Sequence, residues 1–185
     1  MLSDLKSKIK ISTVLFLGGS ITEGSAATHY SNCYASLTAE WLKSVYGTNK
    51  FHHINKGVGG TDSIYGLLRL KRDVIAYKPD LIFIEFAVND SGFNSGRYVE
   101  SIIRSLKTLP SDPYVIFLYT TNNEYTTPTK SFEKIAEHYG IPQISLKNAL
   151  KTYLNSADPI SKGYLADGVH PTDKGHRIYA DEIIK

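Results

Sequence analysis

The feature of this sequence that most limits its fold is a regular alternation of short apolar segments with longer amphipathic ones. The clearest apolar segment is LIFIEF, residues 81–86, in which Glu85 is the one charged residue. Continuous apolar runs of this length are typical of parallel strands that are covered on both faces. We therefore expect strands at residues 12–17, 51–55, 80–86, 114–119 and 143–145.

The amphipathic segments between these runs are predicted to be helices, at residues 34–46, 64–77, 97–107, 130–139, 146–153 and from about residue 172 onward. Local signals support the helix ends. Pro79 ends the second helix, because the residue before a proline avoids the α region. Gly140 stands where a helix-terminating glycine belongs, and Pro171 is expected at the first position of the last helix.

Strict alternation of strand and helix predicts βαβ units with right-handed crossovers. The expected fold class is α/β, a three-layer α/β/α sandwich around a central, parallel, five-stranded sheet. The chain has 185 residues and no linker, repeat or low-complexity tract, so we expect a single domain over residues 1–185. In such folds ligands bind beyond the carboxyl ends of the strands.

Composition restricts the partners and the location that we expect. Hydrophobic residues make up 42% and charged residues 21% of the chain, as in ordinary globular proteins. The net charge of +3 is scattered, which argues against a nucleic-acid partner. No apolar run reaches the roughly 18 residues that a membrane span needs. We interpret the N-terminal segment as leading into a strand and not as a signal peptide, so we expect a cytoplasmic protein.

Residues with chemical function follow three of the predicted strands and precede the last helix. Ser20 follows the first strand after two glycines, and a glycine-rich turn that ends at Gly60 follows the second. Asn89 follows the third strand, and the pair Asp167 and His170 stands before the last helix. Because the carboxyl ends of parallel strands meet at one edge, these residues are expected to lie together.

This set of residues has the parts that acyl transfer requires. His170 can take the proton of the Ser20 hydroxyl, and Asp167 can orient the imidazole and stabilise its charged form. The backbone N–H groups of Ser20 and Gly60 and the side-chain amide of Asn89 can donate to an oxyanion. The sequence therefore predicts a serine nucleophile with a base, an orienting carboxylate and an oxyanion hole.

Two further residues are predicted to bind substrate. Tyr164 lies in the polar loop at residues 155–169, which is long for a compact domain, and loops of that length are often functional. Its ring could stack against a sugar. Asp90 follows Asn89 directly and is the second candidate, and it is expected to support Asn89 and the adjoining loop instead of taking part in the chemistry.

The serine, glycine, asparagine and histidine of this set stand in four separate blocks of the sequence. In this order the four blocks resemble those of the SGNH hydrolases, also called the GDSL family of esterases and lipases. Ser20 matches the nucleophile of the family, Gly60 and Asn89 match its glycine and asparagine blocks, and Asp167 and His170 match its D-x-x-H pair. The resemblance covers nearly the whole chain. It implies a flavodoxin-like fold and a serine esterase that needs no metal and no cofactor.

The sequence departs from the family pattern at two positions. Gly19 stands where the GDS motif has aspartate, and Ala87 stands where the G-x-N-D motif has glycine. Neither change removes a group that does chemistry. The combination of GGSIT with EFAVND is similar to bacterial members that act on carbohydrate esters. The predicted function is therefore hydrolysis of small acyl esters, above all O-acetyl esters on carbohydrates, through an acyl-enzyme.

Several alternatives stay open at this level. A lysophospholipase, thioesterase or arylesterase would use the same residues, as would an O-acyltransferase in which a sugar accepts the acyl group instead of water. A catalytically silent carbohydrate-binding protein is the alternative of another class, and the intact serine, histidine and aspartate argue against it. No H-E-x-x-H or C-x-x-C pattern predicts a metal site. The sequence does not indicate an oligomeric state.

Overall fold

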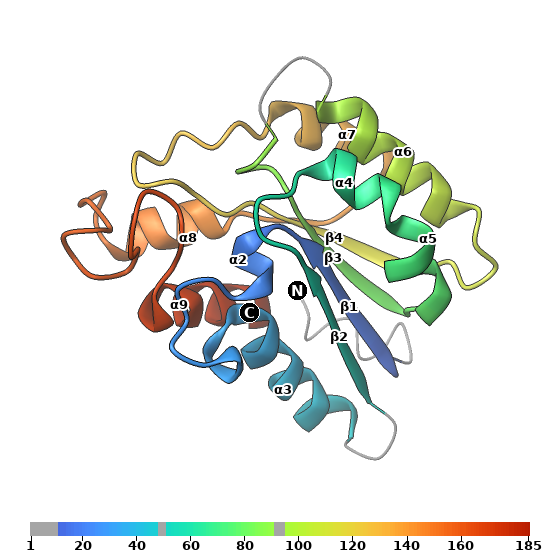
Figure 1. Ribbon diagram of the computed structural model, residues 1–185, viewed down its shortest axis with the longest axis horizontal. Coiled ribbons are helices and arrows are strands. Elements are labelled where there is room, and N and C mark those ends of the chain that lie inside the picture. Colours follow the sequence, from blue (N-terminus) through green and yellow to red (C-terminus); the bar gives the residue numbers. More distant parts are fainter. Residues whose placement is uncertain (1–10, 48–50, 91–94) are drawn as a thin grey trace.

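A sheet of five parallel strands forms the centre of the protein in a computed structural model that describes residues 11–47, 51–90 and 95–185. Figure 1 shows the sheet between its helices. The order of the strands within the described residues is β2-β1-β3-β4-β5. This is the flavodoxin-like order, so the predicted α/β fold class is confirmed. The strands are β1 (Thr13–Gly18), β2 (His52–Gly57), β3 (Leu81–Glu85), β4 (Tyr114–Leu118) and β5 (Gln143–Ile144).

Helices cover both faces of this sheet. One layer contains α3 (Tyr34–Tyr46), α8 (Leu146–Tyr153) and α9 (Asp173–Ile184). The opposite layer contains α4 (Ser63–Leu68), α5 (Leu70–Asp73), α6 (Ser95–Lys107) and α7 (Lys130–Tyr139). The short helix α2 (Ser20–Glu23) follows β1, and the 3₁₀ turns η1 (Tyr30–Asn32) and η2 (Ile75–Tyr77) precede α3 and β3. Among the described residues, no helix combines the length and the apolar character that crossing a bilayer requires.

Alternation along the central strands divides the core into two halves. Leu81 and Phe83 of β3 face α3 and α9, whereas Ile82 and Ile84 face α6 and α7. All four side chains are fully buried, as expected for a parallel strand that is covered on both faces. In the first half, the rings of Phe16 and Phe83 stack with their centroids 4.7 Å apart, which ties β1 to β3.

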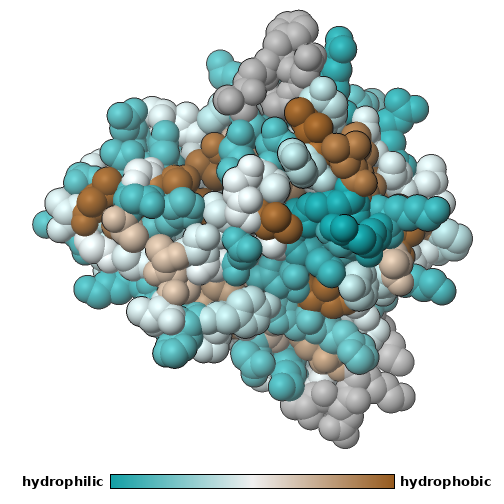
Figure 2. Space-filling model, in the orientation of Figure 1, coloured by the Kyte–Doolittle hydropathy of each residue, from teal (hydrophilic) through white to brown (hydrophobic). Residues whose placement is uncertain are grey.

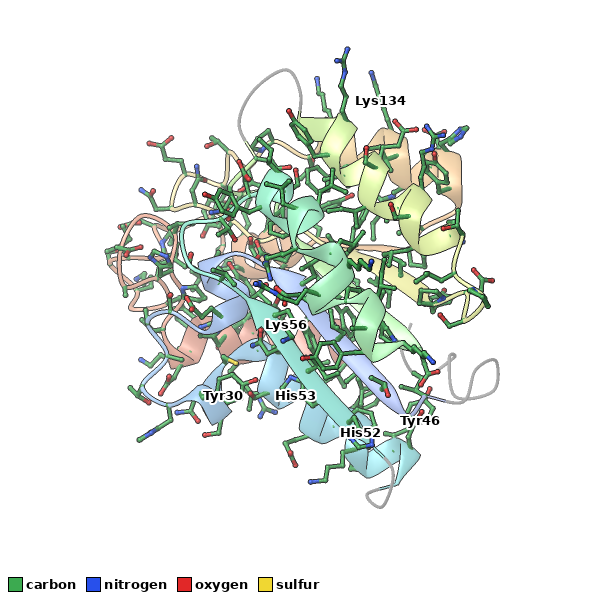
Figure 3. All side chains as sticks on the ribbon, turned by 45° about the vertical axis from the view of Figure 1, so that its right-hand side comes forward. Tyr30, Tyr46, His52, His53, Lys56 and Lys134 are labelled. Atoms are coloured by element: carbon green, nitrogen blue, oxygen red, sulfur yellow. The ribbon has the colours of Figure 1, made fainter. Side chains whose placement is uncertain are left out.

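One edge of the sheet is strand β2, whose side chains are drawn in Figure 3. The ring of His53 stacks against Tyr30 with a centroid distance of 6.2 Å, and the Lys56 ammonium donates a hydrogen bond to the Tyr77 hydroxyl at 3.0 Å. Lysines and bulky rings of this kind protect an edge strand from pairing with other chains. His52 and His53 lie at the amino end of β2, away from the edge that carries Ser20.

The second predicted helix is wrong in one respect, because residues 64–77 form α4, α5 and η2 instead of one helix. The break occurs at Arg69, whose backbone angles are φ −99° and ψ 2°. Its buried guanidinium donates to the carbonyl oxygens of Gly18 at 3.0 Å and Lys56 at 2.8 Å. These bonds join the carboxyl ends of β1 and β2 to the helical layer, and periodicity along one segment does not reveal them.

The start of the last helix also differs from the prediction. α9 begins at Asp173, after an extended Thr172, so Pro171 does not occupy its first position. Pro171 instead forms an isolated antiparallel bridge with Leu165, and the Thr172 hydroxyl donates to the Gly163 carbonyl at 2.8 Å. These contacts hold the segment before α9 in an extended form. The expected glycine end at Gly140 is confirmed, with φ 65° after α7.

Candidate active site

Ser20 is the first residue of α2 and lies at the carboxyl edge of the sheet, directly beyond β1. Gly19 precedes it in an extended conformation, so the chain turns sharply from strand into helix. The Ser20 side chain is buried among its neighbours, with 8% of the residue exposed. The position of this hydroxyl is therefore fixed by the backbone of β1 and α2 and not by a loop.

The ring of His170 lies between Ser20 and Asp167. His170 Nε2 is 2.8 Å from Ser20 Oγ, and His170 Nδ1 is 2.8 Å from Asp167 Oδ2. An ionised carboxylate only accepts hydrogen bonds, so Nδ1 carries the proton and donates it to Asp167. Nε2 is then free to accept from the Ser20 hydroxyl. The structure therefore brings these three predicted residues into one hydrogen-bonded chain.

Asp167 is held as an anion by its surroundings. Its second oxygen, Oδ1, accepts the backbone N–H groups of Val169 at 2.9 Å and His170 at 2.8 Å. Desolvation by itself raises the pKa of Asp167, but the hydrogen bonds from the His170 ring and from these two amides outweigh it and lower the pKa to about 2. The carboxylate is consequently charged throughout the neutral range, as an orienting group for an imidazole must be.

The predicted oxyanion residues lie around the same edge. Gly60 adopts φ 69°, a left-handed conformation that favours glycine, and a Cβ atom built there would meet nothing within 4 Å. Its neighbour Gly59 borders Ser20, because a Cβ on Gly59 would lie 3.9 Å from the Ser20 Cβ. The turn therefore lies beside Ser20 at Gly59 and is open at Gly60.

Asn89 approaches Gly19 closely, which gives a structural reason for the unusual glycine. A Cβ at position 19 would lie 3.0 Å from Asn89 Oδ1 and 3.1 Å from the Thr61 carbonyl oxygen. Those distances are shorter than the separation that such contacts normally keep. Gly19 thus leaves room for the Asn89 amide beside the Ser20 turn, and any side chain there would press on it.

The two predicted substrate-binding residues make contacts of other kinds. Asp90 is buried and its Oδ1 accepts the backbone N–H of Ser63 at 2.9 Å, at the start of α4. The Tyr164 hydroxyl donates to that of Tyr153 on α8 at 3.3 Å, with ring centroids 5.5 Å apart. Neither of these contacts involves Ser20, and the assignment of both residues to substrate binding stays a prediction.

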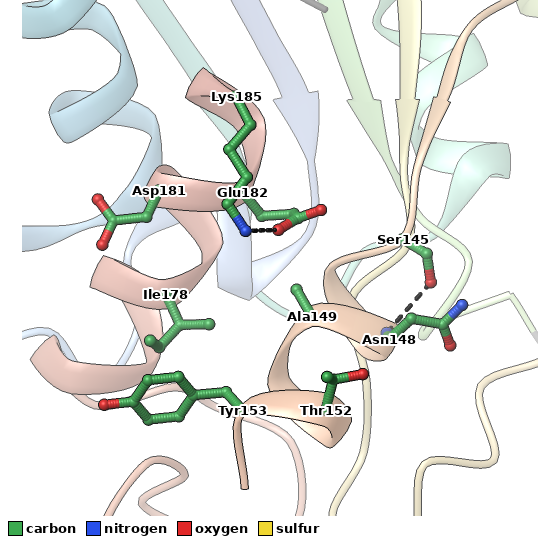
Figure 4. A pocket seen from close by; sticks show the side chains of 9 residues that line it. All are labelled: Ser145, Asn148, Ala149, Thr152, Tyr153, Ile178, Asp181, Glu182 and Lys185. Carbon is green, nitrogen blue, oxygen red and sulfur yellow. Dashed lines mark hydrogen bonds and ion pairs between the residues drawn. The ribbon is translucent and has the colours of Figure 1, made fainter. Parts of the chain in front are cut away.

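Two surfaces adjoin these elements. Beyond Gly60, α4 exposes three apolar side chains, Ile64, Tyr65 and Leu68, in the region where Figure 2 shows apolar colouring over this helix. A groove of about 690 Å³ runs between α8 and α9 (Figure 4). Its lining includes Tyr153, Asp181 and Lys185 but none of the predicted site residues.

In the part of the chain that the structure describes, no group of three or more His, Cys, Asp or Glu side chains is arranged to hold a metal ion.

Sequence reasoning did not assign a function to Glu85, although it stands out as a charge in an apolar strand. The residue is fully buried beneath the Ser20 turn and accepts hydrogen bonds from Thr22 and Thr120. Desolvation raises its pKa to about 7, although the hydrogen bonds from Thr120 and Thr22 act in the opposite direction. The signal in the sequence was the position of a carboxylate one strand away from Ser20, at the same edge.

Comparison with known proteins gives consistent matches over most of the chain. The model of the GDSL-like lipase/acylhydrolase family matches residues 16–178. An acetylxylan esterase from Geobacillus stearothermophilus is 26% identical over 203 residues, which cover 93% of this chain and 92% of the esterase.

Solved structures of esterases are also similar to this chain. A two-domain esterase active on acetylated mannans is 30% identical, with a TM-score of 0.88 over 99% of this chain. This chain spans only about half, 50%, of that esterase. A catalytic mutant of an acetylxylan esterase from Geobacillus stearothermophilus has a TM-score of 0.79 at 22% identity, covering 95% of both chains, which shows a shared fold.

Acid is expected to destabilise the protein through His176, which is buried on α9. Its Nδ1 accepts the Tyr34 backbone N–H at 3.3 Å and its Nε2 faces the Ser25 carbonyl at 3.4 Å. Desolvation lowers its pKa from 6.5 to about 4. Between these values the unfolded chain binds the proton that the folded chain does not, so stability is lost as the pH falls from 6.5 towards 4.

The substitution His176→Gln removes this titration and keeps a neutral side chain that can donate and accept. The free energy of unfolding, measured by urea denaturation at several pH values, should therefore fall less steeply with acid in the variant than in the wild type. The absolute stability of the variant at neutral pH does not enter the comparison. Identical slopes for the two proteins would contradict the assignment of acid sensitivity to His176.

Proposed function

Because the chain belongs to the GDSL-like lipase/acylhydrolase family, and is therefore an ester-bond hydrolase, we propose that it removes acetyl groups from carbohydrate esters by nucleophilic catalysis at Ser20. The observation that carries the proposal is the chain of hydrogen bonds from Ser20 through His170 to Asp167, each 2.8 Å long. The relatives with activities on acetylated xylan and acetylated mannan support carbohydrate esters as the substrate class.

In the first step, Ser20 Oγ attacks the carbonyl carbon of the ester while its proton passes to His170 Nε2. The new carbon–oxygen bond moves an electron pair onto the carbonyl oxygen, which becomes an oxyanion. Asp167 stabilises the imidazolium that results, because its carboxylate accepts the Nδ1 hydrogen bond and is charged at neutral pH.

The oxyanion is stabilised by donors that stand ready before the reaction. We assign this role to the backbone N–H groups of Ser20 and Gly60 and to the Asn89 side-chain amide. The open space at the Gly60 Cα and the close approach of Asn89 to Gly19 support the assignment. Because these donors are already fixed in position, they do not have to reorient during the reaction, as water molecules would. They therefore stabilise the negative charge that develops in the transition state.

The tetrahedral intermediate then collapses. His170 Nε2 returns the proton to the leaving oxygen of the sugar as the bond between carbon and that oxygen breaks, and an acetyl group stays on Ser20. A water molecule next attacks the acyl carbon and gives its proton to His170, which passes it back to Ser20 Oγ as acetate leaves. We retain Tyr164 and Asp90 as candidate contacts for the alcohol part of the substrate.

Removal of the nucleophile or of the base should abolish esterase activity. We expect Ser20→Ala and His170→Ala to lower kcat/KM for p-nitrophenyl acetate by about 10³-fold or more, as in other triads. Ser44→Ala and His138→Ala are matched controls, because both residues are exposed and far from the site. Turnover in both active-site variants equal to the wild type would disprove the mechanism.

The same assay separates the alternative functions. We expect the rate to fall steeply from acetyl to longer acyl esters. We also expect release of acetate from acetylated xylan or mannan. A preference for long chains would favour a lipid or thioester substrate. Acetylated sugar formed from an added acceptor would favour acyl transfer, and sugar binding without any hydrolysis would favour a silent binding protein.

Loss of the Asn89 amide should slow the chemical step. We expect Asn89→Ala to lower kcat by about 10²- to 10³-fold with little change in KM, the usual effect of removing one oxyanion donor. Gly19→Ala should give a smaller loss, because its new Cβ presses on Asn89 Oδ1 and on the Thr61 carbonyl.

A double-mutant cycle in kcat tests whether the two effects are coupled. If Gly19 acts by leaving room for Asn89, then Gly19→Ala should cost much less in the Asn89→Ala background than in the wild type. Equal losses in the two backgrounds would show that Gly19 acts on the turn independently of Asn89. Activity of Asn89→Ala within about two-fold of the wild type would remove Asn89 from the oxyanion hole.

A further inference from the structure

Glu85 occupies an unusual place for a carboxylate. It is the last residue of β3, its side chain is fully buried, and the other four residues of the strand are apolar. Placing a carboxyl group in such a site is unfavourable unless hydrogen bonds compensate for the lost water. The proposed mechanism at Ser20 gives Glu85 no step. A buried acidic group beneath the nucleophile therefore calls for an explanation of its own.

The carboxylate holds the residues on both sides of Ser20. Its Oε2 accepts the Thr22 hydroxyl at 2.9 Å, and the backbone N–H groups of Gly19 and Thr22 lie close enough to the same carboxylate to oppose the rise in its pKa. Gly19 directly precedes Ser20 and Thr22 is two residues after it. Oε1 accepts the Thr120 hydroxyl at 2.8 Å, beyond the carboxyl end of β4. One side chain thus joins the Ser20 turn to the centre of the sheet.

The network continues towards the element that follows His170. The hydroxyls of Thr22 and Tyr34 are 2.7 Å apart. Because Thr22 donates its proton to Glu85, Tyr34 is the donor in this pair. The backbone N–H of Tyr34 in turn donates to His176 Nδ1 on α9 at 3.3 Å. Glu85 is therefore the final acceptor of a buried chain of donors that runs from α3 to the Ser20 turn.

We propose that Glu85 is a positioning residue for the nucleophile, which fixes the Gly19–Thr22 turn so that Ser20 Oγ stays within hydrogen-bond distance of His170 Nε2. The residue contacts neither the substrate nor His170, and acts through the turn. The inference rests on the proposed function, because positioning matters only where Ser20 attacks. A displacement of about 1 Å in a reacting group can cost about 10²-fold in rate, which sets the size of the expected effect.

The variant Glu85→Gln keeps the shape of the side chain but places an N–H₂ donor against the donors of the turn. We expect kcat for p-nitrophenyl acetate to fall by about 10- to 100-fold while KM changes by no more than about three-fold. Hydrogen exchange of the amides at residues 19–23 should become faster, whereas exchange in β4 should not change. The exchange measurement needs no substrate, so it reports on the turn even if the esterase activity itself were absent.

Asp80→Asn is the matched control. Asp80 Oδ2 also accepts several hydrogen bonds, from the Ser12 N–H, the Ser12 hydroxyl and the Thr13 N–H, each at 2.8 Å. These bonds lie at the amino end of the sheet, opposite to Ser20. We expect Asp80→Asn to lower the thermal unfolding midpoint, to leave kcat within about two-fold of the wild type and to leave exchange at residues 19–23 unchanged.

If Glu85→Gln does not fold, Thr22→Val tests the same link, because it removes only the hydroxyl between Tyr34 and Glu85. A loss of kcat without a matching change in KM in the variant that folds supports the proposal. A kcat within about two-fold of the wild type, with unchanged exchange at residues 19–23, overturns it. If the wild type shows no Ser20-dependent esterase activity, the proposed function fails separately, and the exchange result alone decides whether Glu85 holds the turn.

Discussion

The hydrogen bond between Ser20 Oγ and His170 Nε2 joins residues that lie 150 positions apart in the sequence. It exists only because two separate parts of the fold are held in register. Ser20 lies at the carboxyl edge of the sheet because it follows β1. The segment before α9 places His170 at the same edge. The packing of α3 against α9 fixes the distance between them, with Tyr34 and Tyr179 fully buried at that contact. The geometry of the site is thus a property of the whole three-layer arrangement.

The two acidic residues near this bond, Asp167 and Glu85, differ in their surroundings and in their pKa values. Asp167 is largely exposed and stabilised by donors, so it stays ionised. Glu85 is buried beneath the same turn, and its raised pKa reflects the opposite balance between desolvation and hydrogen bonds. In the proposed mechanism these two acidic groups serve different purposes, because Asp167 orients the base and Glu85 supports the backbone that carries the nucleophile.

Most of the fold could be predicted from the sequence, because apolar periodicity and glycine or proline signals are local properties. The parallel five-stranded sheet and the resemblance to the SGNH hydrolases were predicted and are confirmed by the structure and by the family match. The break at Arg69 was missed because it depends on carbonyl oxygens of β1 and β2, far away in the sequence. The closeness of Gly19 to Asn89 and the contacts of Asp90 and Tyr164 are likewise products of tertiary packing. The pattern of residue types along the chain does not reveal the distances between residues that are far apart in the sequence.

The central claim is that Ser20 carries the acyl group during turnover. The most direct measurement is acid quenching of the wild type during the first turnover of p-nitrophenyl acetate, followed by mass spectrometry of the peptide that contains Ser20. The account predicts one acetyl group on Ser20 itself, formed at the rate of the initial release of p-nitrophenol and absent from Ser20→Ala. Acetate release with no acetyl group on Ser20, or with the acetyl group on another residue, would contradict it.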